Sequence, residues 1–173
     1  MAGRSERGFT LIEMVATMTL LAVMAAAAVP FMINGTQAYN NTARGLQTVS
    51  KLRYASERLA RELREIQRDA GGNFDIATPV NVPGNNITFR KSDGVEVIVS
   101  DAAPVANMRY DTLGNTDFTL TDELTSITFS YYLADGITPA TATSDVAYIE
   151  FELILNNGNS YNQRTRVALR NQL

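Results

Sequence analysis

The chain has 173 residues, no cysteine, no histidine and a formal net charge of −3 at neutral pH. This length suits one domain with at most one appended element, and the composition excludes thiolate metal sites, thiol nucleophiles and histidine as a general base. Residues 44–69 hold seven basic and four acidic side chains, whereas residues 71–160 hold three basic and twelve acidic ones, so the second region disfavours nucleic-acid binding.

A short polar leader, residues 1–8, precedes an apolar run over residues 9–33, in which Glu13 is the only charged side chain. At a rise of about 1.5 Å per residue, a helix over this run is long enough to cross a hydrocarbon core of about 30 Å. The two arginines of the leader predict that it stays in the cytoplasm. The C-terminal body would then lie on the other side of the membrane.

Two ordinary interpretations of this segment remain open. In the first, residues 1–28 are a secretory signal peptide, and the run Ala25–Ala28 provides an A-x-A cleavage site, so that the mature chain starts at Val29 and is a soluble secreted protein. In the second, the segment is a simple single-pass anchor. Glu13 argues against both, because an unpaired carboxylate in an apolar helix costs a few kcal/mol at mid-membrane, although less near its end. A charge in this place indicates a partner.

The string GFTLIE at residues 8–13 resembles the class III signal of type IV prepilins and type II secretion pseudopilins. The resemblance implies that a prepilin peptidase cleaves between Gly8 and Phe9 and methylates the new amino terminus at Phe9. It also implies that the partners are other pilin or pseudopilin subunits and an inner-membrane assembly platform. The protein would be held in the bacterial inner membrane with its head in the periplasm, and would then enter a pilus or pseudopilus filament.

Cleavage of this kind suggests a role for Glu13. The freed amine of Phe9 and the Glu13 carboxylate would both lie in surroundings of low dielectric constant, where each needs the opposite charge. Pairing between neighbouring subunits would then fix their axial register. Pro30 stands where members of the resembled family often carry a proline that bends the helix, although it could equally mark the membrane exit.

Residues 34–70 are predicted to form the amphipathic half of the same helix, ended by Gly71-Gly72. Charged residues four apart, such as Arg58 with Glu62 and Arg61 with Glu65, would pair on its other face. Its basic stripe fits a solvated face, or contact with acidic neighbours or anionic lipid. The apolar stripe consists of Leu46, Val49, Leu52, Ala55, Leu59, Leu63, Ile66 and Ala70.

Residues 71–173 are predicted to form a β-rich globular head. Short β-type runs alternate there with turn residues such as Asp93-Gly94 and Asp135-Gly136. The predicted class is therefore α+β and type IV pilin-like, with a long N-terminal helix packed on an antiparallel β-sheet head. The expected strands are residues 87–90, 95–100, 105–110, 117–120, 126–133, 147–155 and 161–169.

Residues 58–65 and 166–171 resemble the J-type pseudopilins of type II secretion and the O-type minor pilins of mannose-sensitive haemagglutinin pili. This resemblance implies a structural minor subunit at or near the tip of a filament. A pilus-borne adhesin is an alternative function. Its aromatic contacts would come from Tyr131, Tyr132, Tyr148 and Tyr161, although tyrosines at strand positions usually pack.

No catalytic, cofactor or metal site is expected, and the protein is predicted not to be an enzyme. The sequence contains no phosphate loop, dinucleotide fingerprint or nucleophile elbow. Glu150 and Glu152 alternate with apolar residues and are expected on the wet face of a strand, with a glycosidase-like pair as the alternative. The loop from Asp135 to Asp145 has oxygen ligands for Ca²⁺, but fits a solvated loop better.

Overall fold

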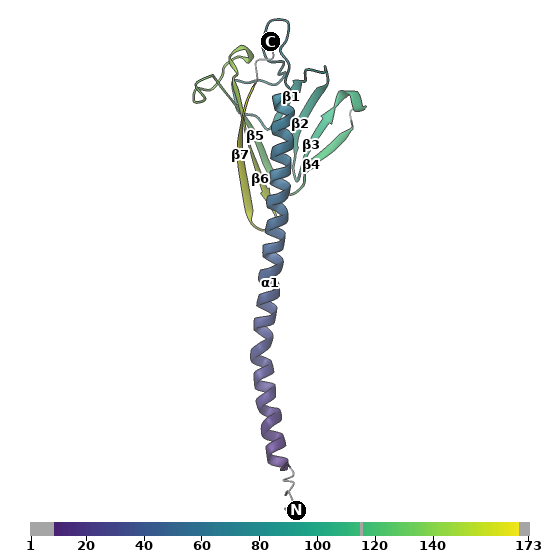
Figure 1. Ribbon diagram of the computed structural model, residues 1–173, viewed down its shortest axis with the longest axis vertical. Coiled ribbons are helices and arrows are strands. Elements are labelled where there is room, and N and C mark those ends of the chain that lie inside the picture. The colour runs from purple at the N-terminus through teal and green to yellow at the C-terminus, as the bar shows by residue number, and fades with distance from the viewer. Residues whose placement is uncertain (1–8, 115, 170–173) are drawn as a thin grey trace, which may run out of the picture. The chain divides into compact units, whose positions relative to one another are not determined.

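The computed structural model describes residues 9–114 and 116–169. One helix, α1 (Leu11–Arg64), precedes all the strands (Figure 1). The predicted α+β class is confirmed, and each predicted strand is present with ends within two residues of the expected ones. The strands are β1 (Asn86–Arg90), β2 (Glu96–Ala102), β3 (Val105–Tyr110), β4 (Asp117–Thr121), β5 (Leu124–Tyr132), β6 (Tyr148–Asn156) and β7 (Ser160–Ala168).

The chain divides into two compact units, of which the first ends at Ala43 and the second begins at Arg44. The second unit, residues 44–173, is called the head unit below. It contains the last part of α1, residues 44–64, together with all seven strands.

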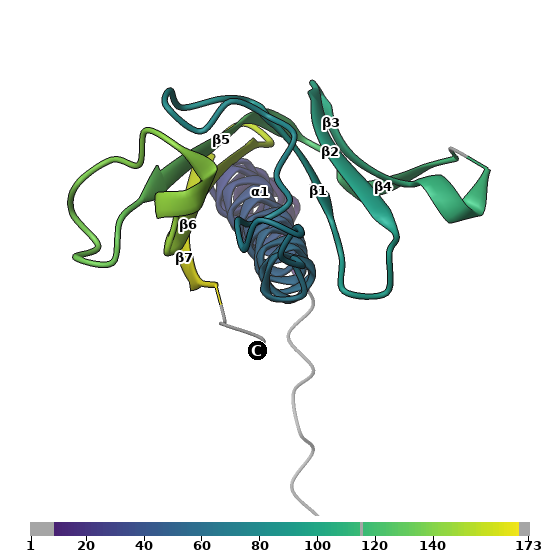
Figure 2. The same cartoon turned by 90° about the horizontal axis from the view of Figure 1, so that it is seen from above.

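The head unit has two antiparallel sheets, with strand orders β1-β2-β3-β4 and β5-β6-β7. Figure 2 shows them on either side of the head part of α1. The outer strand β7 runs beside β6 in unbroken register from Tyr148 opposite Ala168 to Asn156 opposite Ser160. Alternation along β5 and β6 places apolar side chains on one face, where the rings of Phe129 and Phe151 lie 6.4 Å apart.

The apolar stripe of α1 closes this core. Leu52, Ala55, Leu59 and Leu63 are each at most 4% exposed, because they recur at three- and four-residue spacing and face the sheets. At the start of the predicted stripe, however, Leu46 and Val49 remain exposed, at 63% and 44%. The stripe therefore packs against the head only from Leu52 onward.

The expectation that the helix reaches residue 70 is wrong, since α1 ends at Arg64. The next residues bond to the first sheet instead of continuing the helix. The amide of Gln67 donates to the carbonyl of Arg90 at 2.9 Å, and the amide of Ser92 donates to the carbonyl of Glu65 at 2.9 Å. Hydrogen bonds to the sheet thus take the place of the last helical turns, because tertiary contacts can override helix propensity.

Candidate functional site

The start of α1 is fixed by Thr10. Its hydroxyl oxygen accepts a hydrogen bond from the amide of Glu13 at 3.3 Å, and its carbonyl accepts one from the amide of Met14 at 3.2 Å. Thr10 is thus the N-cap, and Thr10-Leu11-Ile12-Glu13 has the spacing of a capping box. Sequence reasoning missed this cap, although the T-x-x-E spacing could have revealed it.

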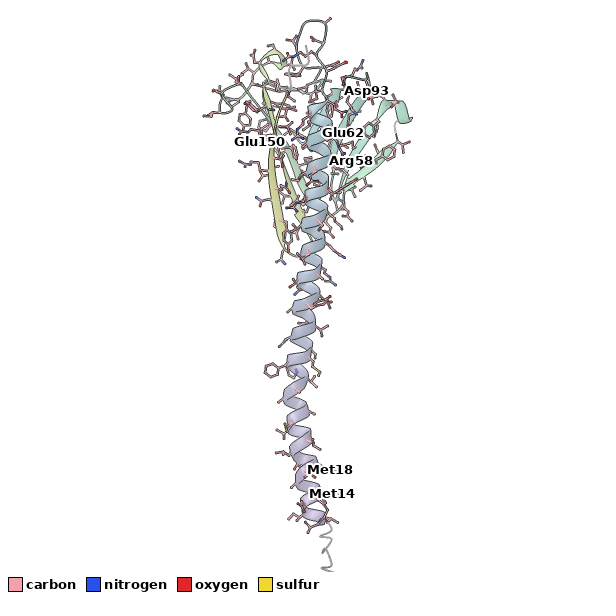
Figure 3. All side chains as sticks on the ribbon, viewed as in Figure 1. Met14, Met18, Arg58, Glu62, Asp93 and Glu150 are labelled. Carbon is pink, nitrogen blue, oxygen red and sulfur yellow. The ribbon has the colours of Figure 1, made fainter. Side chains whose placement is uncertain are left out.

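Every side chain from Phe9 to Thr42 is exposed in this chain on its own. The large apolar ones include Leu11 at 83%, Ile12 at 77% and Phe31 at 80% exposure, and Figure 3 shows Met14 and Met18 projecting from the first turns of α1. A helix that is apolar on all sides needs apolar surroundings, either lipid or other helices.

The threonines of this segment have satisfied hydroxyl groups. Thr17 donates to the carbonyl of Met14 at 2.9 Å, Thr19 to that of Ala16 at 2.9 Å, and Thr36 to that of Met32 at 2.9 Å. Hydrogen bonds back to the preceding turn remove the need for water. These polar residues are therefore compatible with a bilayer.

By length and composition, α1 contains a segment that is able to cross a membrane. An 18-residue window near its N-terminal end has a mean hydropathy of 2.0, and none of that window is buried within the chain. This combination differs from a core helix of a soluble protein, which would be mostly covered. It agrees with anchoring in a membrane.

The predicted site residues lie in different parts of this segment. Gly8 and the leader lie outside the described residues, whereas Phe9 precedes the cap and is 76% exposed. Glu13 occupies the first turn of α1, where a negative charge is favoured by the helix dipole. Pro30 lies inside α1, which continues past it, so that the carbonyl four residues earlier lacks its usual amide donor.

A polar cluster that sequence reasoning missed joins the end of α1 to the first sheet. The ammonium group of Lys91 lies 3.1 Å from Glu62 and 2.8 Å from Glu65, and the hydroxyl of Tyr110 donates to Glu62 at 2.9 Å. Figure 3 shows Glu62 and Arg58 on this part of α1, on the side of Asp93. Burial lowers the pKa of Lys91, but hydrogen bonds to Glu65 and Glu62 outweigh it and raise that pKa.

A second cluster ties α1 to the turn between β4 and β5. Glu123, which has a positive φ of 61°, accepts hydrogen bonds from Thr48 at 2.8 Å and Lys51 at 3.1 Å. Asn157 donates to Thr48 and to the carbonyl of Arg44, the latter at 3.1 Å. In both clusters the charged side chains pair with one another and join α1 to other elements, which is typical of a structural role.

The carboxylates considered for catalysis are engaged in ion pairs. Glu150 lies 2.7 Å from Arg166, and Glu152 lies 3.4 Å from Arg164, across the pair β6–β7. Each carboxylate is thus neutralised by an arginine on the neighbouring strand. This arrangement gives no support to a glycosidase-like acid and base.

The other candidate residues also have local partners. The carboxylate of Asp135 accepts hydrogen bonds from the amides of Ile137 and Thr138, both at 2.9 Å, so it shapes its own turn. Among the described residues, no group of three or more acidic side chains gathers to hold a metal ion. Tyr131 is 3% exposed, while Tyr132, Tyr148 and Tyr161 are half-buried, which is typical of packing residues.

Residues 3–29 match the family model described as the prokaryotic N-terminal methylation motif. The comparison with curated proteins found no significant match. The matched segment contains the residues that carry the resemblance to prepilins, as well as the cap of α1 and most of its apolar part. It therefore supports a pilin-like protein with an N-methylation motif and an N-terminal membrane helix.

Proposed function

We propose that this protein is a structural minor pilin or pseudopilin, which is anchored in the inner membrane and incorporated into a filament at or near its tip. One observation carries the proposal: the segment that matches the methylation motif is also the start of a helix whose apolar side chains are exposed on all sides. A filament subunit accounts for both features. The motif marks a site of processing, and the helix must be covered by lipid or by neighbouring helices.

In this proposal, a prepilin peptidase cleaves between Gly8 and Phe9 and methylates the amine of Phe9. The new terminus lies just before the N-cap, so cleavage leaves Thr10 and the first turn of α1 intact. The head then lies in the periplasm, and Pro30 bends the helix. Other subunits and an assembly platform in the inner membrane are the partners.

The N-terminus can be measured directly on protein purified from its own membranes. We expect intact mass and N-terminal sequencing to find a chain that starts at methylated Phe9. A chain that starts near Val29 would refute the proposal, because the apolar segment would then be a discarded signal peptide.

The role of the Glu13 charge can be tested separately from the position of Glu13 in a capping box. Glutamine also suits the fourth position of the box, so Glu13→Gln removes the charge and keeps the capping chemistry. If Glu13 pairs with the amine of a neighbour, Glu13→Gln and Glu13→Ala both leave cleavage largely intact and reduce the amount of subunit in sheared filaments. We expect a loss of at least about tenfold for either variant, because a tenfold change corresponds to only about 1.4 kcal/mol, and breaking a charge pair in low-dielectric surroundings costs about 3–5 kcal/mol.

Glu96→Gln is the matched control, since Glu96 is a glutamate of β2 in the head unit with a partly exposed side chain. It should enter filaments as the unmodified chain does. Normal incorporation of Glu13→Gln would contradict a role for the charge. Normal incorporation of Glu13→Gln together with loss in Glu13→Ala would assign Glu13 to the cap instead.

A further inference from the structure

The free edge of β7 borders a groove on the head unit that none of the features above uses. Two adjoining hollows, of about 470 and 220 Å³, lie between α1 and β7, and Gln163 lines both. From α1 the groove is lined by Val49, Leu52, Arg53, Ser56, Glu57, Ala60 and Arg64, and from β7 by Ser160, Tyr161, Asn162, Gln163 and Thr165. Figure 2 shows β7 beside α1 at the outer end of its sheet.

The backbone of β7 has unpaired hydrogen-bonding groups at its free edge, beside this groove. In the described part of the chain, β7 pairs with β6 alone. The amide of Leu169 donates to the carbonyl of Ala147 at 2.9 Å, which sets the alternation of the ladder. Residues an even number of positions from Leu169 therefore bond to β6, and those between them, Asn162, Arg164 and Arg166, present their N–H and C=O groups at the free edge.

An edge of this kind accepts an added strand. Edge strands commonly carry a proline, a bulge or a covering segment that prevents pairing. The pairing of β7 with β6 is regular over nine residues, and the sequence of β7 contains no proline. The groove beside it gives the side chains of an added strand a place to lie.

The charge of the groove indicates the kind of strand that it would take. Arg53 and Arg64 line it and are exposed, and among the described residues neither forms an ion pair. The nearby acids Glu62 and Glu65 are already paired with Lys91, so Glu57 is the acidic side chain that faces the groove. The groove thus carries net positive charge on a head unit that is otherwise acidic.

We propose that this groove binds an extended acidic segment of another polypeptide, which adds to the free edge of β7 as an antiparallel or parallel strand. Backbone hydrogen bonds to Asn162 and Arg164 supply the affinity, and Arg53 and Arg64 select negative side chains. The proposal does not rest on the function proposed above, since it concerns the head unit alone.

The test uses the purified full chain in detergent and two fluorescently labelled peptides of about nine residues, a length that matches β7. One peptide alternates glutamate with valine, and the other alternates lysine with valine. We expect fluorescence anisotropy to show binding of the glutamate peptide that is at least about tenfold tighter than binding of the lysine peptide. Equal binding of the two peptides would overturn the proposal.

Two pairs of variants separate the backbone from the charge. Asn162→Pro removes one outward N–H without removing a bond to β6, and Asn162→Ala is its matched control because it keeps the N–H. Arg64→Ala removes a charge that lines the groove, and Arg61→Ala removes an exposed charge of the same helix that does not line it. We expect Asn162→Pro and Arg64→Ala to weaken binding by about tenfold and the two controls to change it little.

Unchanged binding in Asn162→Pro would overturn the strand addition, provided that its circular dichroism melting curve matches that of Asn162→Ala. The chain has no cysteine, so Gln163→Cys places a single thiol in the groove. If neither peptide binds and this variant forms disulfide-linked dimers, the occupant is a second copy of the chain and the acidic partner is refuted.

Discussion

Gly45 shows how closely a single residue controls the packing of α1 on β7. A Cβ atom at this position would lie 2.6 Å from the hydroxyl oxygen of Tyr161 and 3.6 Å from the ring carbon that bears it. The first distance is a clash and the second an ordinary contact. The hydroxyl group alone is therefore in the way of a larger residue here, in a helix where alanine would otherwise be more stable by about 1 kcal/mol.

We therefore expect the effect of Gly45→Ala to depend on Tyr161. In the unmodified chain Gly45→Ala should stabilise the fold less than helix propensity alone would give, because the Tyr161 hydroxyl must shift. In a Tyr161→Phe background the same change should raise the free energy of unfolding by up to about 1 kcal/mol. Denaturant unfolding of the four proteins measures this double-mutant cycle, and equal effects in both backgrounds would contradict the contact.

At the scale of elements, Lys91 fixes the end of α1 against the first sheet. Its side chain and that of Glu62 are each 14% exposed, so removal of the lysine would leave a nearly buried carboxylate without its cation. We expect Lys91→Met to destabilise the chain by roughly 2–3 kcal/mol, somewhat less than the loss of a fully buried pair. Lys51→Met is a useful control, because Lys51 pairs with the more exposed carboxylates Asp122 and Glu123.

Lys91 also predicts that the free energy of unfolding depends on pH in the alkaline range. The pKa of Lys91 is raised in the folded chain above its ordinary value of 10.5, so its contribution to stability is complete below pH 10.5 and is lost as the pH rises through the folded value. Burial also raises the pKa of Tyr110 above 10.0, which acts in the same direction. Lys91→Met should therefore reduce the alkaline loss of stability without abolishing it, and an unchanged pH profile would contradict the role of Lys91.

The sequence was sufficient for the elements that depend on local pattern. Alternation predicted β6 to within one residue at each end, because its apolar face is buried and its other face carries polar side chains. That second face is less exposed than expected, since Glu150 and Glu152 are paired with arginines of β7 and are 12% and 28% exposed. The end of α1 was missed because Ile66 bridges to Lys91, a residue that is distant in sequence. The split into two sheets and the free edge of β7 depend on such long-range pairing and left no local signal.

The candidate functional residues show the same division between local sequence signals and long-range contacts. Glu13 and the apolar run stand out in the sequence because they depart from ordinary composition within a few residues, whereas Phe9 was singled out by the resemblance of residues 8–13 to prepilin signals. The groove between α1 and β7 combines residues more than ninety positions apart, such as Arg64 and Gln163. In the sequence, the arginines of the groove cannot be told apart from residues of an ordinary solvated helix face. Only the fold shows that the neighbouring acids Glu62 and Glu65 are paired with Lys91.

At the scale of the whole molecule, the hydrophobic core belongs entirely to the head unit. The first buried apolar residue along the described chain is Leu52, and the large apolar side chains before it are exposed. A chain that begins at Arg44 keeps every buried residue and loses the segment that requires lipid or other helices. We therefore expect residues 44–173 to be soluble without detergent and to unfold cooperatively.

A shorter chain supplies the contrast. Starting at Glu65 removes Leu52, Ala55, Leu59 and Leu63, which are at most 4% exposed and fill the space between the sheets. Losing a single buried leucine side chain costs about 2–5 kcal/mol, so the loss of three is comparable to the whole free energy of unfolding of a domain this size. Near-ultraviolet circular dichroism and urea unfolding should show fixed packing for residues 44–173 and none for residues 65–173. Cooperative unfolding of the shorter chain would mean that the sheets form a core without α1.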